Sequence, residues 1–408
     1  KDQIMTTEVY HSSGKSAFAN GYEYKGQPMI ISEYGGIAFN NDDSGWGYGN
    51  KVNTKEEDEL GELASGILEI MVDGYGFLRP KNYTQESRDI YISQSQIRRF
   101  NLKNGDEIVG HARNSKNGER YNALMRVDLV NGQNPDQAKK RIAFEFLTPI
   151  YPNERVYLGK DNEQLSMRLI DLISPIGKGQ RGIIVAPPKA GKTTLLKDIA
   201  LSVSKNYPNI KIFILLIDER PEEVTDIKEA LDADNVEVIY STFDEKSESH
   251  IKVAQTTLER AKRLTEQGYD TMILLDSLTR LTRANNLTVT PSGRTLSGGL
   301  DPASFYFPKR LFGAARNTRE GGSLTILATA LIETGSRMDD MVYEEFKGTG
   351  NMELVLSRKL QEKRIFPAID VQKSGTRRED LLLSKDEYEA MQIIRKSLDQ
   401  TTIEQATD

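Results

Sequence analysis

The sequence is poor in the residues that build metal centres or covalent crosslinks. Among its 408 residues it has no cysteine and three histidines. The absence of cysteine excludes disulfide bonds and thiolate chemistry. His11, His111 and His250 lie too far apart in the chain to suggest a metal cluster. Any catalysis would therefore rest on lysine, arginine and carboxylate side chains.

Two kinds of segment are also missing. No uninterrupted apolar run reaches the length of a membrane span, and the N-terminus lacks the basic and then apolar pattern of a signal peptide. We therefore expect a soluble, cytoplasmic protein without a membrane segment. The formal net charge of -6 argues against a protein that coats nucleic acid over its whole surface, but it is compatible with a local basic channel.

The chain divides into regions of different composition. Residues 1–57 are rich in glycine, asparagine, serine and tyrosine and contain the only tryptophan, Trp46. Residues 58–140 hold short alternating segments separated by turns, which predict a small all-β barrel. After a linker at 141–164, strands alternate with helices through residues 165–408, as is typical of a mostly parallel sheet covered on both faces.

The individual elements are predicted from the apolar pattern. The barrel strands are expected at Gly66–Ile70, Gly76–Arg79, Asp89–Ile92, Asp106–Gly110 and Tyr121–Val127. The strands of the second domain are expected at Gly182–Ala186, Ile210–Ile217, Val236–Ser241, Thr271–Asp276 and Leu324–Ala330, with a long helix at Ser249–Gln267.

The most informative motif is Ala-Pro-Pro-Lys-Ala-Gly-Lys-Thr at Ala186–Thr193. It follows an apolar strand and precedes a helical pattern, so that backbone N–H groups at the helix start can surround the phosphates of a nucleotide. Lys192 would reach the outer phosphates and Thr193 would hold Mg²⁺. Ala186 stands where the usual form of this loop has glycine. We call Ala186–Thr193 the phosphate loop and expect ATP and Mg²⁺ as its ligands.

Two carboxylates follow apolar strands of the same domain. Asp276 ends Met272–Asp276 and would hold the water shell of the magnesium ion. Glu219 follows Leu215–Asp218 and would position or deprotonate the attacking water, although a solvated surface turn explains its composition equally well.

Arginines would supply the remaining charge of the site. A guanidinium can stabilise the charge that spreads over a transferred phosphoryl group. Arg280, Arg364 and Arg377 are the candidates. One chain does not reveal which of them acts across a subunit boundary.

Longer segments carry a family resemblance. Together with the phosphate loop they resemble the Rho family of transcription termination factors, over residues from about 60 to about 400. The segments are Ile176–Gly182, Leu216–Thr225, Asp276–Arg280, Phe312–Asn317, Tyr343–Leu354 and Lys363–Asp370. The resemblance implies a RecA-like ATPase domain preceded by a small OB-fold barrel of the cold-shock type that binds RNA.

The resemblance also implies roles for individual residues. Glu219 corresponds to the catalytic carboxylate, Arg377 to an arginine finger given to the neighbouring subunit, and Arg364 to an arginine that links adjacent sites. Lys192 completes the catalytic set, and Thr193 and Asp276 are the magnesium positions. The positions that correspond to nucleotide contacts are Gly177, Lys178, Gly179, Gln180, Arg181, Gly182, Lys189, Ala190, Gly191, Lys192, Thr193, Thr194, Arg220 and Phe366, the last of which packs on the adenine base.

Two RNA sites are expected. In the barrel, Tyr75 and Phe77 are two residues apart and share a face, so each ring can stack a base; core packing is the alternative explanation for such rings. The further positions of this site are Arg79, Tyr91, Glu119, Arg120 and Tyr121. Pro291–Gly299 and Glu333–Asp339 resemble two loops that grip RNA in the central hole of a ring, with Arg294 and Arg337 where lysine is common; plain connecting loops are the alternative.

The first 57 residues depart from this family. They resemble a fragment of a glycoside hydrolase of the β-galactosidase superfamily, in which Glu33 would match the nucleophile. The segment lacks the second carboxylate and the eight strand–helix units that such an enzyme needs. We expect a non-functional tail, either a genuine fusion or a joining artefact. The C-terminus is expected to be short, because the family continues with further helices.

The sequence thus predicts an ATP-dependent RNA helicase that forms a homohexameric ring, binds nascent single-stranded RNA and terminates transcription. RNA polymerase and transcription elongation factors would be its partners. The alternatives are a rotary-type ATPase, which should lack the aromatic pair of the barrel, a passive RNA-binding protein, which would not need Glu219 and Arg377, and an inactive fusion product.

Overall fold

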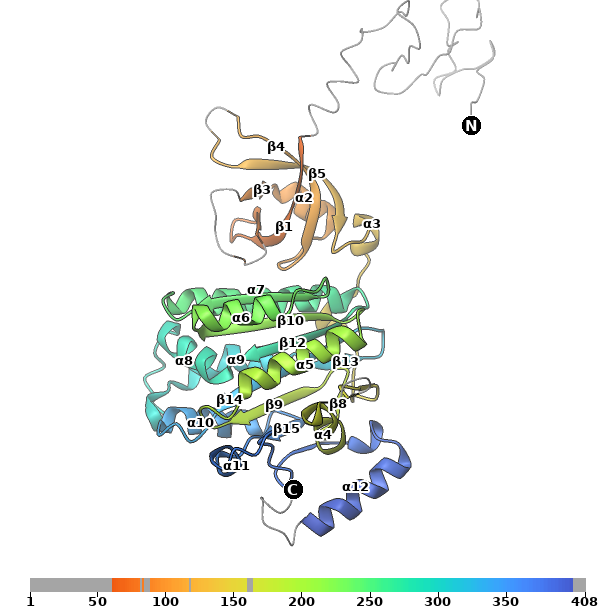
Figure 1. Ribbon diagram of the computed structural model, residues 1–408. Coiled ribbons are helices and arrows are strands. Elements are labelled where there is room, and N and C mark those ends of the chain that lie inside the picture. The colour runs from red at the N-terminus through yellow and green to blue at the C-terminus, as the bar shows by residue number, and fades with distance from the viewer. Residues whose placement is uncertain (1–60, 81–82, 84–88, 117–118, 160–163, 399–408) are drawn as a thin grey trace, which may run out of the picture. The chain divides into compact units, whose positions relative to one another are not determined.

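A computed structural model describes residues 61–80, 83, 89–116, 119–159 and 164–398 (Figure 1). The predicted glycoside-hydrolase-like segment at 1–57 lies outside the described residues. In the part that is described, no helix combines the length and the apolar character that a bilayer crossing requires.

Five strands form a closed barrel in the order β1-β2-β3-β5-β4. Alternate residues of these strands, such as Leu68, Ile92 and Ile108, point inward and are fully buried. The strands are β1 (Glu62–Ile70), β2 (Gly76–Arg79), β3 (Ile90–Ile92), β4 (Glu107–Arg113) and β5 (Asn122–Val130), and the helices α2 (Gln94–Phe100) and α3 (Pro135–Ala138) accompany them. All five strands coincide with predicted segments, so the predicted barrel is confirmed.

The stretch that we predicted as a linker carries short elements of its own. These are η1 (Phe144–Phe146), β6 (Pro149–Ile150) and β7 (Arg155–Val156). β6 pairs with β13 (Arg316–Thr318) and β7 pairs with β8 (Ile176–Gly177), so backbone hydrogen bonds attach this stretch to the domain that follows. Periodicity could not predict these pairings, because two-residue strands carry no periodic signal.

The second domain, called the α/β domain below, is built on a nine-stranded sheet. Its central strands run in the order β11-β10-β12-β14-β9-β15-β16, and the pairs from β11 to β15 are parallel. The sheet contains β6 together with β9 (Arg181–Ala186), β10 (Lys211–Glu219), β11 (Val236–Thr242), β12 (Asp270–Asp276), β13 (Arg316–Thr318), β14 (Ser323–Leu331), β15 (Met352–Val355) and β16 (Gly375–Thr376), whereas β8 (Ile176–Gly177) pairs with β7 outside this sheet. The predicted mostly parallel sheet is confirmed.

Helices cover both faces of this sheet, as Figure 1 shows. Successive residues of β10 alternate between two hydrophobic clusters: Ile214 and Leu216 face α4, α5 and α6, whereas Leu215 and Ile217 face α7, α8 and α9. The helices are α4 (Leu165–Ile173), α5 (Lys192–Asn206), α6 (Pro221–Ala230), α7 (Ser247–Glu266), α8 (Leu278–Thr288), α9 (Tyr306–Gly313), α10 (Arg337–Lys347), α11 (Arg358–Glu362) and α12 (Lys385–Leu398), with the 3-10 turns η2 (Ser297–Gly299), η3 (Pro302–Phe305) and η4 (Glu379–Leu381).

The parallel order places the functional loops at one edge. The carboxyl ends of β9, β10, β12 and β14 lie together, which is where ligands bind in open α/β sheets. The phosphate loop follows β9, while Glu219 and Asp276 end β10 and β12. This edge is the candidate site.

Candidate functional site

The phosphate loop turns sharply between β9 and α5. Lys189 and Gly191 have positive φ angles of 66° and 85°. Gly191 is the N-cap of α5, where a left-handed backbone is easy only for glycine. No atom lies within 4 Å of the position of a Cβ on Gly191, so the backbone conformation, not crowding, requires glycine here. The loop thus presents its N–H groups at the start of a helix, as phosphate binding requires.

Lys192 joins the two predicted carboxylates. Its Nζ lies 2.7 Å from both Oδ1 and Oδ2 of Asp276 and 3.3 Å from Oε1 of Glu219. Asp276 is fully buried, and its Oδ1 also accepts a hydrogen bond of 2.8 Å from the Thr329 hydroxyl. The structure therefore brings together three residues that are widely separated in the sequence.

Burial and charge set the protonation of this cluster. Burial and the Asp276 carboxylate raise the pKa of Glu219 above its ordinary value, against the opposing effect of Lys192 and Arg280. Burial favours the neutral amine of Lys192, but Asp276 and Glu219 outweigh it and raise the lysine pKa. A carboxylate with a raised pKa is suited to accept a proton from water.

Arg280 is, after Lys192, the second cation that lies beside Glu219. Its Nη1 lies 3.3 Å from Glu219 Oε1 and donates a hydrogen bond to the backbone oxygen of Asp218. Among the described contacts of the three candidate arginines, Arg280 is the one that reaches Glu219, the predicted catalytic carboxylate, within the same chain.

The residues fit a magnesium ion bound together with phosphate. Thr193 Oγ1 lies 3.3 Å from Asp276 Oδ2, so a hydroxyl and a carboxylate converge at the helix start. Oxygen ligands of this kind suit Mg²⁺, which retains water and is shared with substrate phosphates.

An open pocket of about 420 Å³ lies beside the phosphate loop. Phe366 forms part of its wall and is 60% exposed, so its ring is free to pack against a base. The pocket is lined by Gln164, Leu165, Ser166, Ala190, Gly191, Thr194, Leu195, Asp198, Leu356, Phe366, Pro367 and Ala368. Four of the predicted nucleotide contacts therefore meet here. Arg220 is exposed at the start of α6, and Lys189 is exposed in the loop.

The segment Gly177–Gly182 lies elsewhere in this chain. It precedes and begins β9, whereas the phosphate loop follows the end of that strand. Three strand residues lie between them, so Gly182 and Ala186 are about 13 Å apart. The chain does not bring this predicted nucleotide segment to its own phosphate loop.

Instead, Asn351 joins Gly177–Gly182 to the predicted arginine finger. Its Oδ1 accepts hydrogen bonds from Gln180 Nε2 (2.6 Å) and Arg181 N (2.9 Å), and its backbone oxygen accepts one from Arg377 N (2.8 Å). Burial and the nearby Arg316 and Arg377 lower the pKa of Arg181. Three arginines thus gather at this end of the sheet.

Arg377 and Arg364 are exposed. Within the described residues, neither guanidinium has an ion pair or a side-chain hydrogen bond. Arg364 lies just after α11 with a positive φ of 59°, two residues before Phe366. Both cations are therefore available to a group outside this chain.

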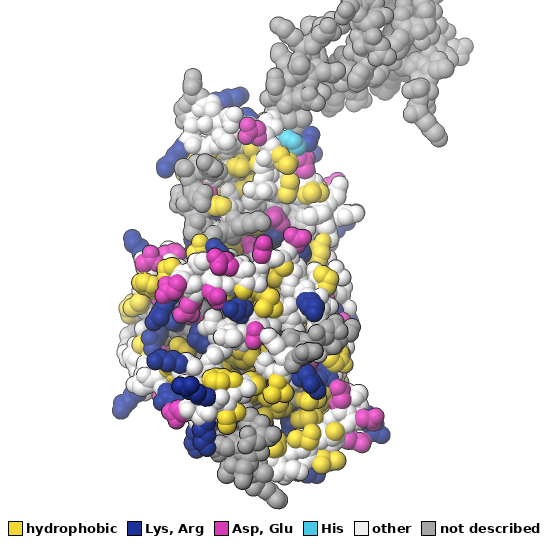
Figure 2. Space-filling model, viewed as in Figure 1, with side chains coloured by type: hydrophobic (Ala, Val, Ile, Leu, Met, Phe, Trp, Pro, Cys, Tyr) yellow, Lys and Arg dark blue, Asp and Glu magenta, His cyan; other side chains and the backbone are white. Residues whose placement is uncertain are grey.

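The two predicted central loops contact each other. A Cβ on Gly298 would lie only 2.6 Å from Met338 N, so η2 packs directly on the start of α10. Arg294 and Arg337 are exposed on these loops. Figure 2 shows Lys and Arg side chains gathered along the side of the α/β domain where α10 lies.

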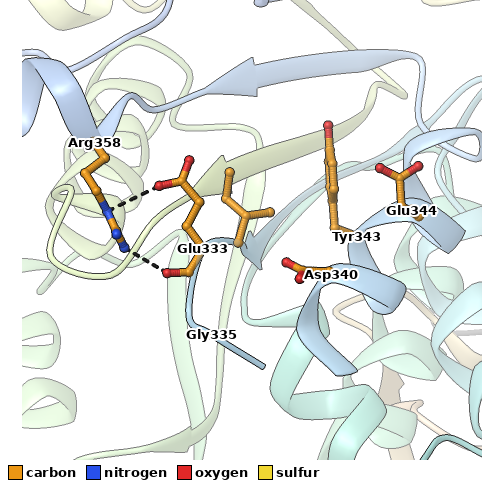
Figure 3. A pocket seen from close by; sticks show the side chains of 7 residues that line it. Glu333, Gly335, Asp340, Tyr343, Glu344 and Arg358 are labelled. Atoms are coloured by element: carbon orange, nitrogen blue, oxygen red, sulfur yellow. Dashed lines mark hydrogen bonds and ion pairs between the residues drawn. The ribbon is translucent and has the colours of Figure 1, made fainter. Parts of the chain in front are cut away.

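A second cavity of about 640 Å³ adjoins the Glu333–Asp339 loop (Figure 3). Arg358 anchors the loop: its Nε lies 3.2 Å from Glu333 Oε2 and its Nη2 donates to the Glu333 backbone oxygen at 2.8 Å. Asp340, Tyr343 and Glu344 of α10 form the other wall in Figure 3. The loop is thus held at its first residue by an ion pair that the sequence did not reveal.

Four aromatic rings cluster on the barrel. The ring centroid of Phe77 lies 5.8 Å from that of Tyr75, 6.2 Å from that of Tyr91 and 4.8 Å from that of Tyr121. None of the four rings is fully buried, so the set forms a partly open platform and not a closed core. The Arg120 guanidinium lies 5.3 Å from the Tyr121 centroid, in cation–π geometry.

Two of the residues predicted to bind RNA, Arg79 and Glu119, form ion pairs with other residues of the barrel. Arg79 is buried, with Nε 2.6 Å from Glu69 Oε2 and a second ion pair to Asp89, and its guanidinium stands 5.1 Å from the Phe77 centroid. Glu119 accepts two hydrogen bonds from Arg113, which together with the Lys116 N–H lower its pKa to about 2. The carboxylate partners of Arg79 lie on β1 and just before β3, so its burial could not be predicted from the sequence.

Comparisons with known proteins match both domains. The family model described as "Rho termination factor, RNA-binding domain" matches residues 64–136. The model described as "ATP synthase alpha/beta family, nucleotide-binding domain" matches residues 166–376, more than half of the chain.

Solved structures with a similar fold include an ATPase of the type III secretion system of pathogenic bacteria. It is 28% identical with a TM-score of 0.54, and the match covers 62% of this chain and 70% of that one. An ATP synthase subunit from Nanoarcheaum equitans, 23% identical with a TM-score of 0.51 and 62% coverage of each chain, shares the fold.

Three relatives, each named transcription termination factor Rho, are similar over most of their length. The protein of Bacillus subtilis is 58% identical over 349 residues, which cover 85% of this chain and 81% of the relative. That of Pseudomonas aeruginosa is 55% identical, covering 85% and 83%. That of Thermotoga maritima is 57% identical, covering 84% and 80%. The chain therefore belongs to the transcription termination factor Rho family.

Proposed function

We propose that this chain is an RNA-dependent ATPase and helicase that binds nascent single-stranded RNA and terminates transcription. The observation that carries the proposal is the Lys192–Asp276–Glu219 cluster at the phosphate loop, in a chain that also bears an open aromatic platform on a separate barrel. A passive RNA-binding protein would not need the Lys192–Asp276–Glu219 cluster, and a rotary ATPase would not need the aromatic platform.

ATP hydrolysis follows from the geometry of the cluster. The N–H groups of the phosphate loop and Lys192 would bind the phosphates, and Thr193 and Asp276 would hold a Mg²⁺ ion, which would supply positive charge to them. When phosphates occupy the loop, Lys192 turns from the carboxylates toward them. Glu219, with its raised pKa, then accepts a proton from the attacking water.

A homohexameric ring would supply the remaining charge. Arg377 is exposed and without a carboxylate partner among the described residues, and it lies at the end of the sheet opposite the phosphate loop of its own chain. In a ring that arginine, with Arg181 beside it across Asn351, would meet the nucleotide of the neighbouring subunit. Arg364, beside Phe366, would link adjacent sites.

RNA would be held at two places. The platform of Tyr75, Phe77, Tyr91 and Tyr121 stacks bases, which is sequence-tolerant because every base has a π face. The contacting loops that carry Arg294 and Arg337 would grip the backbone in the centre of the ring, where planar guanidinium groups bind phosphate as forks. RNA polymerase and elongation factors are the partners that this role implies, in the cytoplasm.

The decisive experiment is ATP hydrolysis measured with and without cytidine-rich single-stranded RNA. RNA-stimulated turnover is expected. Equal turnover in both conditions would instead favour the rotary-type alternative, and no turnover at all would favour an inactive fusion product.

Phe77→Ala is expected to weaken single-stranded RNA binding by about 1 to 3 kcal/mol, the cost of losing one stacked base. Phe77 contacts three other rings, so the change also loosens the platform. Equilibrium titration with labelled RNA measures the effect. Phe146→Ala removes a ring that is 80% exposed in η1 and serves as the matched control; equal affinity of the two variants would contradict the stacking role.

Arg280→Gln is expected to move the acidic limb of the pH–rate profile to higher pH. Glu219 must be deprotonated to act as a base, and Arg280 is one of the two cations that lower its pKa against burial and Asp276. Removing this cation raises the Glu219 pKa further, so activity is lost mainly on the acidic side. The pH dependence of kcat/KM measures the shift, and a uniform loss at all pH values would assign Arg280 a different role.

A further inference from the structure

One residue of β10 interrupts the regular pairing of that strand with β11. Ile217 pairs with Ser241, and Glu219 pairs with Thr242, the next residue of β11. Asp218 is therefore an extra residue on the β10 side, and its φ of 57° lies in the left-handed region. Such an extra residue is a β-bulge, which bends the strand and can aim a neighbouring side chain in a new direction.

The bulge decides on which face of the sheet Glu219 lies. Before the bulge the strand alternates: Leu216 packs in the hydrophobic cluster on the α5 side, and Ile217 packs in the cluster on the α7 side. If this alternation continued, Glu219 would share the α7 side with Ile217, because the two are two residues apart. In the observed register Glu219 instead lies on the α5 side, where its Oε1 is 3.3 Å from Lys192 Nζ. A shift of one residue thus exchanges the two faces.

Neighbouring contacts hold the bulge in place. Arg280 Nη1 donates a hydrogen bond to the backbone oxygen of Asp218, and the same atom lies 3.3 Å from Glu219 Oε1. The backbone oxygen of Glu219 accepts a hydrogen bond of 3.1 Å from Phe243 N, just after β11. The left-handed region costs most residues about 1 to 2 kcal/mol, but aspartate and asparagine adopt it more readily than other residues that carry a side chain. The residue type at position 218 therefore suits the bulge.

The charge of Asp218 acts on the other side of the strand. Burial lowers the pKa of His250 on α7, and the charges of Asp218 and Glu245 partly oppose this effect. We infer that Asp218 is a positioning residue for ATP hydrolysis, which acts through its backbone conformation by turning Glu219 toward the phosphate loop. Its own carboxylate is not required. The inference rests on the proposed function and adds the residue that orients the base.

The test compares three substitutions at position 218 of the full-length chain. Asparagine adopts a positive φ readily, alanine does so less readily, and valine favours the extended backbone of a regular strand. In RNA-stimulated ATP hydrolysis we expect Asp218→Asn to keep kcat within about threefold and Asp218→Val to lose at least about 10²-fold, the cost of misplacing a catalytic group by about 1 Å, with Asp218→Ala between them. The KM for ATP should change by less than about threefold, because the groups that bind the nucleotide are retained.

Asn101→Val is the matched control. Asn101 also has a positive φ, of 51°, but it is the C-cap of α2 in the barrel. This variant should lower the free energy of unfolding and leave kcat at saturating RNA unchanged, whereas a position 218 variant should change kcat.

Three results would overturn the inference alone. If Asp218→Asn lost as much activity as Asp218→Val, the carboxylate and not the backbone would be required. If all three variants kept full activity, the bulge would not position Glu219. If the valine variant did not fold, equal kcat values for the asparagine and alanine variants would contradict the inference. Absence of RNA-stimulated turnover in the unmodified chain would overturn the proposed function as well.

Discussion

Lys192→Ala is expected to lower RNA-stimulated ATP turnover by about 10²- to 10³-fold, the usual cost of removing one charge-stabilising donor from an active site. Lys192 is the cation nearest to Asp276, and it is placed at the phosphate loop where the terminal phosphate would bind. Steady-state turnover at saturating RNA measures the loss. Affinity for RNA at the barrel platform should be unchanged, because the aromatic rings belong to a different domain.

The same substitution has a second expected effect, on stability. Without the ammonium group, Asp276 and Glu219 stay buried close together with less compensation, and breaking a buried ion pair in this way costs about 3 to 5 kcal/mol. Chemical denaturation of the nucleotide-free protein measures it. Lys192→Arg keeps a cation beside both carboxylates, so it should restore most of the stability without restoring turnover. If Lys192→Ala and Lys192→Arg had the same free energy of unfolding, the ion pairs of Lys192 would not stabilise the folded protein as inferred.

Lys197→Ala controls for position on the helix. Lys197 lies five residues further along α5 and pairs with Asp226, whose side chain is 67% exposed. An exposed pair contributes about 0 to 1 kcal/mol. Lys197→Ala should therefore lower the free energy of unfolding much less than Lys192→Ala does. Such a difference would show that the buried partners of Lys192, and not the presence of an ion pair alone, account for the stabilisation.

The phosphate loop and the sheet could be predicted because their signals are local. The phosphate-loop motif can be recognised from the eight residues Ala186–Thr193 alone, and each buried parallel strand appears in the sequence as a continuous apolar run. The positions of Glu219 and Asp276 also followed, because the carboxyl ends of parallel strands meet at one edge. In this part of the site the sequence was sufficient to predict the cluster that the structure contains.

Other parts depend on contacts between distant segments and could not be predicted. The strand order β9-β15-β16 alone brings Arg181 and Arg377 to either side of Asn351. The burial of Arg79 depends on Glu69 and Asp89 from two other parts of the barrel. The side of the nucleotide pocket that includes Gln164 and Asp198 exists only once α4 and α5 pack together. None of these pairings leaves a periodic or spacing signal in the chain.

Arg377→Ala is expected to reduce ATP turnover by about 10³- to 10⁵-fold, the range for removal of an arginine finger. The side chain is exposed, so its loss should leave the stability of the subunit nearly unchanged. Turnover and denaturation of the same preparation measure the two quantities. Arg378→Ala is the neighbouring control, because Arg378 is already paired with Asp380 at 3.0 Å.

Mixing two inactive variants tests whether Arg377 acts on a neighbour. Lys192→Ala subunits retain a complete arginine finger, and Arg377→Ala subunits retain a complete phosphate loop. If the finger acts across a subunit boundary, a mixed ring contains interfaces in which an intact Arg377 faces an intact Lys192, and these interfaces should hydrolyse ATP in a single turnover. If Arg377 acted within its own chain, every subunit of the mixture would lack one essential group and no activity would return. The separation of Arg377 from the phosphate loop, at opposite ends of the sheet, predicts the first result, since a side chain cannot span the length of β9.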